Sequence, residues 1–146
     1  MMQSNLNTAA EMDENMDNTA KKKVLLLGID PKFIDVNLTA TTGWDANRVK
    51  AVAQEANNKL TELGYEVQNC FVDIGETAES VVSDRLLREK FDCIMIGAGV
   101  IILPQHTALF EKIINTIHQK TPPSSKVCFN TSPSDTVEAV LRWVSN

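Results

Sequence analysis

The sequence predicts an α/β fold, a three-layer sandwich in which helices cover both faces of a four-stranded parallel sheet. Apolar, strand-like runs alternate with amphipathic, helix-like segments along the chain, which implies parallel pairing through right-handed crossovers. The runs 24–29 and 91–96 are apolar almost throughout, as expected of strands buried on both faces. The run 65–74 instead alternates in polarity, which is typical of an edge strand.

These patterns also predict the order of the strands and the bounds of the helices. With the first and third strands inside and the second at an edge, the order is 2-1-3-4, a flavodoxin-like or Rossmann-like sheet. The fourth strand is the short run 126–129. Apolar residues at helical spacing, with start and stop residues around them, predict helices over 45–63, 78–90, 104–120 and 132–144.

Two segments lie outside this regular pattern. Residues 1–20 are polar and acidic without a period, so we expect a disordered tail and a single domain over residues 21–146. Residues 31–44 also lack a period and contain Phe33 and Trp44. So long a connection is often a lid or a binding loop, but it can equally be a loop whose aromatic side chains cover an edge of the core. The sequence leaves both interpretations open.

Composition excludes some partners and indicates a compartment. The net charge of −5 disfavours a nucleic-acid surface or an anionic membrane surface, because phosphate binding needs a local excess of Lys and Arg. No apolar stretch is long enough to span a bilayer, and no leader-like pattern opens the chain. Cys70, Cys93 and Cys128 fall in strand-like runs without a CxxC pair, which favours buried, reduced thiols. We expect a cytoplasmic protein.

Topology places a binding site where the connections after the first and third strands leave in opposite directions, at the carboxyl ends of those strands. The loops that meet there are 30–44 and 97–104, with the loops after 74 and 129 beside them. The candidate ligand-binding residues are Asp30, Phe33, Asp35, Trp44, Gly97, Ala98, Gly99, Asn130 and Thr131.

Gly97-Ala98-Gly99 has two interpretations. Glycines after a strand let backbone amides approach an anion, or they simply permit a sharp turn. The dinucleotide fingerprint requires a third glycine where this chain has Ile102, and no acidic strand end follows at the expected distance. NAD and FAD are therefore not predicted. The loop GIDPKFID also lacks the Ser/Thr-rich cradle that FMN requires, so the cofactor remains unassigned.

Catalytic candidates are few. His106, near the crevice, and Asp30, at the end of the first strand, are the groups that could transfer a proton. His118 lies about 18 Å from His106 if one helix carries both, so the two cannot share a metal ion, and the cysteines sit on separate strands. No metal site is predicted. The sequence contains no GxSxG, Walker or HExxH motif, and it does not decide whether the protein is an enzyme.

Two resemblances accompany this interpretation. The layout resembles a response-regulator receiver domain, and Asp30 falls near that family's acidic metal-binding position. The phosphoacceptor position is occupied by Ile96-Gly97, and the fifth strand with its lysine is missing. More closely, FDCIMIGAGV, LFEKIIN and VCFNTSPSDTVEAVLRW resemble a group of short bacterial and fungal proteins of unassigned function. In that group an arginine often follows GAGV, where this chain has Ile101.

Three hypotheses about function follow. The first is a small domain that binds a small ligand, with anions among the candidates, at the crevice or serves as a regulatory module. The second is a small enzyme that uses Asp30 and His106. The third is a self-associating interaction module, a homodimer joined through the apolar segment 100–103.

Overall fold

The sheet has the predicted topology. The computed structural model describes residues 20–145, apart from the side chain of Asn37, so the expected tail lies outside the described residues except for Ala20. The strands are β2 (Lys23–Ile29), β3 (Glu66–Val72), β4 (Cys93–Ile96) and β5 (Lys126–Phe129). All neighbours pair in parallel in the order β3-β2-β4-β5, which confirms the predicted order 2-1-3-4.

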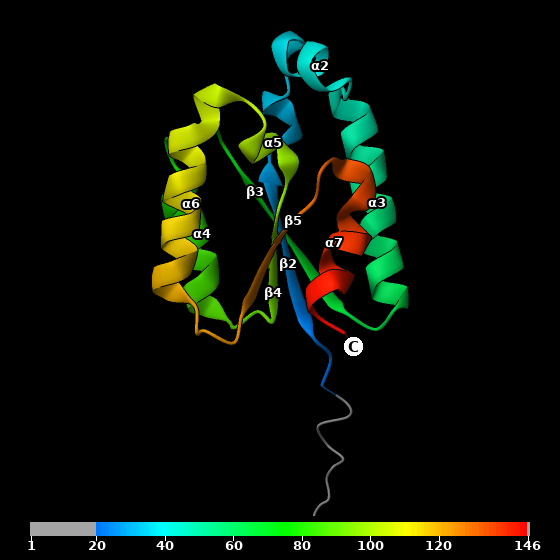
Figure 1. Cartoon of the computed structure of the whole chain (residues 1–146), viewed down its shortest axis with the longest axis vertical. Coiled ribbons are helices and arrows are strands. Elements are labelled where there is room, and N and C mark those ends of the chain that lie inside the picture. The colour runs from blue at the N-terminus through cyan, green and yellow to red at the C-terminus, as the bar shows by residue number, and fades with distance from the viewer. Residues whose placement is uncertain (1–19, 146) are drawn as a thin grey trace, which may run out of the picture.

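Helices cover both faces of this sheet. Figure 1 shows α4 and α6 on one side, α3 and α7 on the other, and α2 and α5 above the carboxyl ends of the strands. The α-helices are α2 (Val36–Thr42), α3 (Ala46–Glu62), α4 (Ala78–Arg88), α5 (Ala98–Ile101), α6 (Thr107–Lys120) and α7 (Thr136–Trp143). Single 3-10 turns are η2 (Pro31–Phe33), η3 (Pro104–His106) and η4 (Pro133–Asp135). Within residues 20–145, no helix is both long and apolar enough to cross a membrane.

The side chains of β2 and β4 alternate between two cores, one on each face of the sheet. Leu25, Leu27 and Ile29 join Ile94 and Ile96 in the core beneath α4 and α6. On the other face, the core beneath α3 and α7 contains Val24, Leu26, Leu60, Tyr65, Cys93, Met95, Cys128, Ala139, Val140 and Val144. Gly28 also belongs to this second face, and it contributes no side chain there.

Local signals explain where several helices begin and end. The Asp45 carboxylate accepts a hydrogen bond of 2.8 Å from Arg48 N and caps α3, and Gly64 after that helix has a φ of 97°. Ser132 and Asp135 form a capping box at η4. Thr77 precedes α4 without a side-chain cap bond. Its amide and hydroxyl instead donate to the Asp73 carboxylate.

The segment 31–44 differs from the long irregular connection that the sequence predicts. It forms η2 and α2, and an aspartate caps each: Asp30 accepts from Lys32 N and Asp35 from Leu38 N. The run of threonines hid this helix, because β-branched residues have a low helix propensity. Gly43 ends α2 with a φ of 78°. The connection therefore presents ordered helical structure at the carboxyl edge of the sheet.

The edge strand β3 is also more complex than simple alternation suggests. The side chains of its even-numbered residues share one face, and their exposure decreases along the strand. Glu66 is exposed, whereas Cys70 and Val72 are buried beneath α4. Phe71, expected on the buried side, is 49% exposed. Phe71 pairs with Gly28 on the neighbouring strand, which offers it no cross-strand side chain.

Candidate functional site

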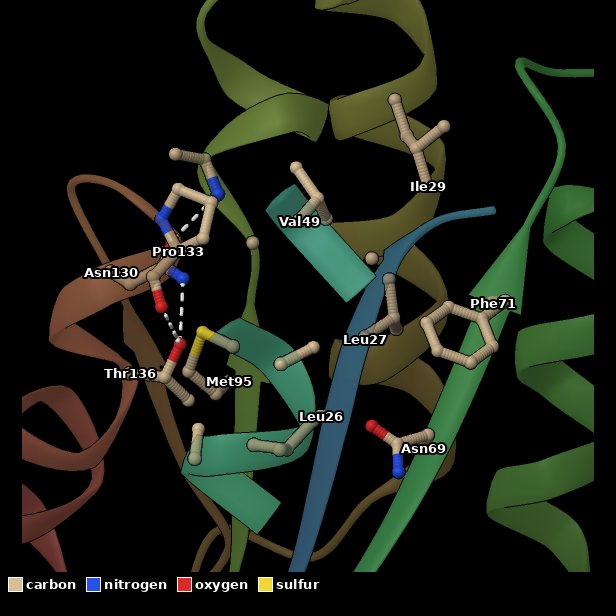
Figure 2. Close-up of a pocket in the computed structure, with 15 residues that line it drawn as sticks. Leu26, Leu27, Ile29, Val49, Asn69, Phe71, Met95, Asn130, Pro133 and Thr136 are labelled. Atoms are coloured by element: carbon tan, nitrogen blue, oxygen red, sulfur yellow. Dashed lines mark hydrogen bonds between the residues drawn. The ribbon is translucent and has the colours of Figure 1, made fainter. Parts of the chain in front are cut away.

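A cavity opens between the sheet and α3 at the carboxyl end of β2. We call it the inner cavity, and its volume is about 100 Å³. Its lining residues are Leu26, Leu27, Gly28, Ile29, Val49, Ala53, Ala56, Asn69, Phe71, Met95, Gly97, Ala98, Asn130, Pro133 and Thr136. Figure 2 shows these residues converging from both central strands, α3, the edge strand and the loop after β5. The cavity lies at the predicted position, where the connections after β2 and β4 leave the sheet in opposite directions.

The inner cavity exists because small residues face each other across two layers. Gly28 provides its floor, and a Cβ atom built there would meet nothing within 4 Å. Ala53 and Ala56 face it from α3. Protein interiors are normally packed to crystal-like density, so a space between a central strand and its covering helix is a distinctive feature of this fold.

A second space, the outer cavity, adjoins the inner one and has a volume of about 290 Å³. The two share Val49 and Pro133 in their walls. The other residues of the outer cavity are Ile34, Leu38, Thr41, Thr42, Trp44, Ile102, Thr131 and Ser132. The Arg48 guanidinium lies 4.0 Å from the centre of the Trp44 ring, and this cation–π contact orients the indole at the rim of the cavity.

Hydrogen bonds fix the polar wall of the inner cavity. The Asn130 carboxamide accepts a bond of 2.7 Å from Ala98 N and donates one of 3.0 Å to Thr136 Oγ1. The Thr136 hydroxyl in turn donates to Pro133 O at 3.3 Å. Asn130 thereby joins the end of β5 to the start of α5 and to α7. Its side-chain oxygen is held in place by the backbone amide of Ala98.

The loop beside the outer cavity is held by Asp135. The Thr131 hydroxyl donates to this carboxylate at 2.6 Å, and the amides of Thr131 and Ser132 donate at 2.9 and 3.1 Å. Partial burial alone would raise the pKa of Asp135, but these hydrogen bonds outweigh burial and hold that pKa below its usual value. Because Thr131 already donates its hydroxyl proton, its oxygen faces a ligand mainly as an acceptor.

The candidate ligand-binding residues fall into two sets. Gly97, Ala98 and Asn130 line the inner cavity, and Trp44 and Thr131 line the outer one. The structure thus gathers these five residues around adjoining spaces.

The other four candidates line neither cavity and have structural roles. Asp30 and Asp35 cap η2 and α2, and Phe33 packs against the core beneath α4 and α6. Gly99 lies within α5, and its carbonyl is hydrogen-bonded to His106.

The proposed catalytic groups, Asp30 and His106, also have separate structural partners. His106 is buried in η3, and its Nδ1 atom lies 3.0 Å from Gly99 O, so this nitrogen carries the proton that the carbonyl accepts. Asp30 accepts from the amide of Lys32. Neither residue lines either cavity. Among the described residues, no group of three or more His, Cys, Asp or Glu residues could hold a metal ion.

Sequence reasoning missed Gly28, Asn69 and Phe71 as cavity residues, although Gly28 and Asn69 each left a signal. A glycine inside an apolar strand often marks open space or a close approach of another group. Asn69 interrupts the apolar side of an alternating strand, between Val67 and Phe71. Neither residue was assigned to a site, because the spacing of the apolar residues identifies each strand without them.

Comparison of the chain with family models, with curated proteins and with solved structures gave no match. The resemblances to receiver domains and to a group of short bacterial and fungal proteins therefore remain predictions.

Proposed function

We propose that the chain is a small-molecule-binding domain whose ligand occupies the inner and outer cavities at the carboxyl ends of β2 and β4. One observation supports this most directly: a space floored by Gly28 lies where the connections after β2 and β4 leave the sheet in opposite directions, and a second space adjoins it. Ligands of open α/β sheets bind at this position. The outer cavity alone approaches the lower end of the range of about 300–1,000 Å³ for ligand sites.

The lining supports binding more than catalysis. It combines apolar side chains with a few neutral polar groups, a composition common to small-molecule sites. Asp30 and His106, which an enzyme would use, are each committed to a local hydrogen bond outside the cavities. A regulatory role would use the same site, because ligand binding there would contact α3, α5 and the loop after β5 together.

The test fills the inner cavity and measures binding of simple ring compounds. The probes are phenol, benzoate and benzylamine, which offer one ring in neutral, anionic and cationic form. Binding is followed by amide chemical shifts and by Trp44 fluorescence in a Trp143→Phe background. We expect at least one probe to give saturable shifts around Gly28 and Val49, and the variant Gly28→Val to abolish them.

Loss of binding in Gly28→Val can be separated from loss of folding. Valine favours strands, its Cβ meets nothing within 4 Å, and replacing a strand glycine stabilises by roughly 0.5–1 kcal/mol. The variant should therefore unfold at a higher temperature. Gly99→Ala is the matched control, since a Cβ there also meets nothing within 4 Å and Gly99 lines neither cavity. Binding that survives in Gly28→Val, or the absence of any bound probe, would refute the proposal.

A further inference from the structure

We propose that the ligand is an uncharged ring with an adjacent hydrogen-bond donor and acceptor, as in a lactam, and that Asn69 binds this pair. The inference rests on the function proposed above and specifies its ligand class. Its starting point is a contrast among the polar side chains of the inner cavity. Asn130 and Thr136 hydrogen-bond each other, whereas the Asn69 carboxamide forms no hydrogen bond with any other residue drawn in Figure 2.

The position of Asn69 is that of a residue that contacts a ligand. It pairs with Leu26 on β2, and Phe71 pairs with Gly28, so both β3 side chains lie at the edge of the cavity on the side that faces α3. The backbone of Asn69 is held in place, because Arg85 Nη1 donates to its carbonyl at 2.8 Å. The residue is half-buried, and its carboxamide presents a donor and an acceptor group side by side.

The chemistry of a carboxamide indicates the complementary group. An asparagine can bind an adjacent donor and acceptor in a bidentate manner, as it does with the edge of adenine in DNA. A lactam or another cyclic amide presents the same pair in one plane. A ligand with only an acceptor or only a donor would leave half of the Asn69 carboxamide unpaired on burial, which is unfavourable.

Charge further restricts the ligand. None of the described side chains lining either cavity is charged. Carboxylates of the flanking loops are used as caps, since Asp45 accepts from Arg48 N and Asp135 accepts from Thr131. The Arg48 guanidinium is stacked on Trp44. An ionised group inside these cavities would lose its hydration without gaining a counter-charge, so the enclosed part of the ligand is neutral.

The shape of the inner cavity favours a flat ring. Gly28 leaves a bare stretch of β2 beside its partner Phe71 on β3, and Met95, which pairs with Leu26 two residues earlier on β2, lines the same cavity from β4. A ring lying over this glycine would contact the Phe71 ring and the Met95 thioether, both of which favour aromatic partners. Binding would also cover Phe71, which is 49% exposed without a ligand.

The experiment compares 2-pyridone with N-methyl-2-pyridone, which keeps the ring and carbonyl but lacks the N–H donor. Binding is measured by amide chemical shifts with wild type, with Asn69→Leu, and with Gln68→Leu as the matched control on the opposite face of β3. We expect wild type and Gln68→Leu to prefer 2-pyridone by about tenfold, the value for one or two net hydrogen bonds. Asn69→Leu should bind both compounds equally.

The outcomes separate this inference from the proposed function. Equal binding of the two pyridones by wild type would overturn the role of Asn69, while binding of phenol would leave the small-molecule site intact. Tighter binding of benzoate or benzylamine than of 2-pyridone would overturn the neutral ligand class. If no ring compound binds wild type, the proposed function fails together with this inference. Thermal unfolding of each variant verifies that it is folded.

Discussion

Asn130 Oδ1 accepts a hydrogen bond of 2.7 Å from the backbone amide of Ala98. This bond joins the end of β5 to the first residue of α5, across 32 residues of sequence. Asn130 is 7% exposed, so water cannot readily replace it. Its second bond, to Thr136 Oγ1, extends the link to α7. The polar wall of the inner cavity therefore depends on one side chain.

We expect Asn130→Leu to lower the free energy of unfolding by about 1–3 kcal/mol, the cost of leaving a buried amide without its partner. Urea denaturation of wild type and variant measures the difference. The matched control is Asn58→Leu, an exposed asparagine of α3, which should change stability by less than about 0.5 kcal/mol. Equal effects of the two substitutions would show that the Asn130 network contributes nothing to stability.

The same pair shows how far sequence reasoning extends. Parallel topology correctly brought Ala98 and Asn130 to one edge of the sheet, because the carboxyl ends of parallel strands must meet there. It could not predict that they would bind each other, since hydrogen-bond partners depend on how closely the loops approach. The cavity over Gly28 was missed for a similar reason: its emptiness depends on Ala53 lying opposite, a relation between two elements that periodicity does not describe.

Asp135 gives the loop after β5 a pH-dependent stability. Its folded pKa lies below its usual value because the hydrogen bonds from Thr131 and Ser132 outweigh partial burial. Asp135 therefore stabilises the fold above the unfolded pKa of about 3.9, and this contribution is lost as the pH falls through the folded pKa. We expect the free energy of unfolding of Asp135→Asn to fall less than that of wild type when the pH is lowered from neutral to about pH 3. Parallel pH curves for wild type and variant would contradict this.

The cysteines should be unreactive in the folded protein. Cys70, Cys93 and Cys128 are at most 1% exposed. The pKa of Cys93 is raised by its hydrogen bond to Cys128, whose sulfur lies 3.5 Å away, and by burial. Since the thiolate is the reactive form, an aromatic disulfide reagent should label no thiol in native protein and all three in urea. An Ala108→Cys variant, with an exposed thiol, should react at once; prompt labelling of wild type would contradict the prediction.

Asn57 marks a position where the chain is less stable than it could be. Its Oδ1 atom is buried and has no hydrogen-bond partner, which costs free energy because the atom has lost its water. We expect Asn57→Leu to raise the free energy of unfolding by about 1 kcal/mol, as measured by urea denaturation. The adjacent exposed residue, substituted as Asn58→Leu, controls for the general effect of placing leucine in α3. No gain over that control would contradict the prediction.

The exposed end of α5 tests the homodimer proposed from the sequence. The structure buries Val100 and Leu103 but leaves Ile101 and Ile102 exposed at 37% and 43%, so half of the apolar segment is available to a second copy. Apolar surface at a two-fold interface is removed from water on both subunits. We expect light scattering to detect dimers of wild type that increase with concentration, and only monomers of Ile101→Glu. Leu87→Glu, at an exposed leucine of α4, should still form dimers. Monomers of wild type at every concentration would exclude self-association through α5.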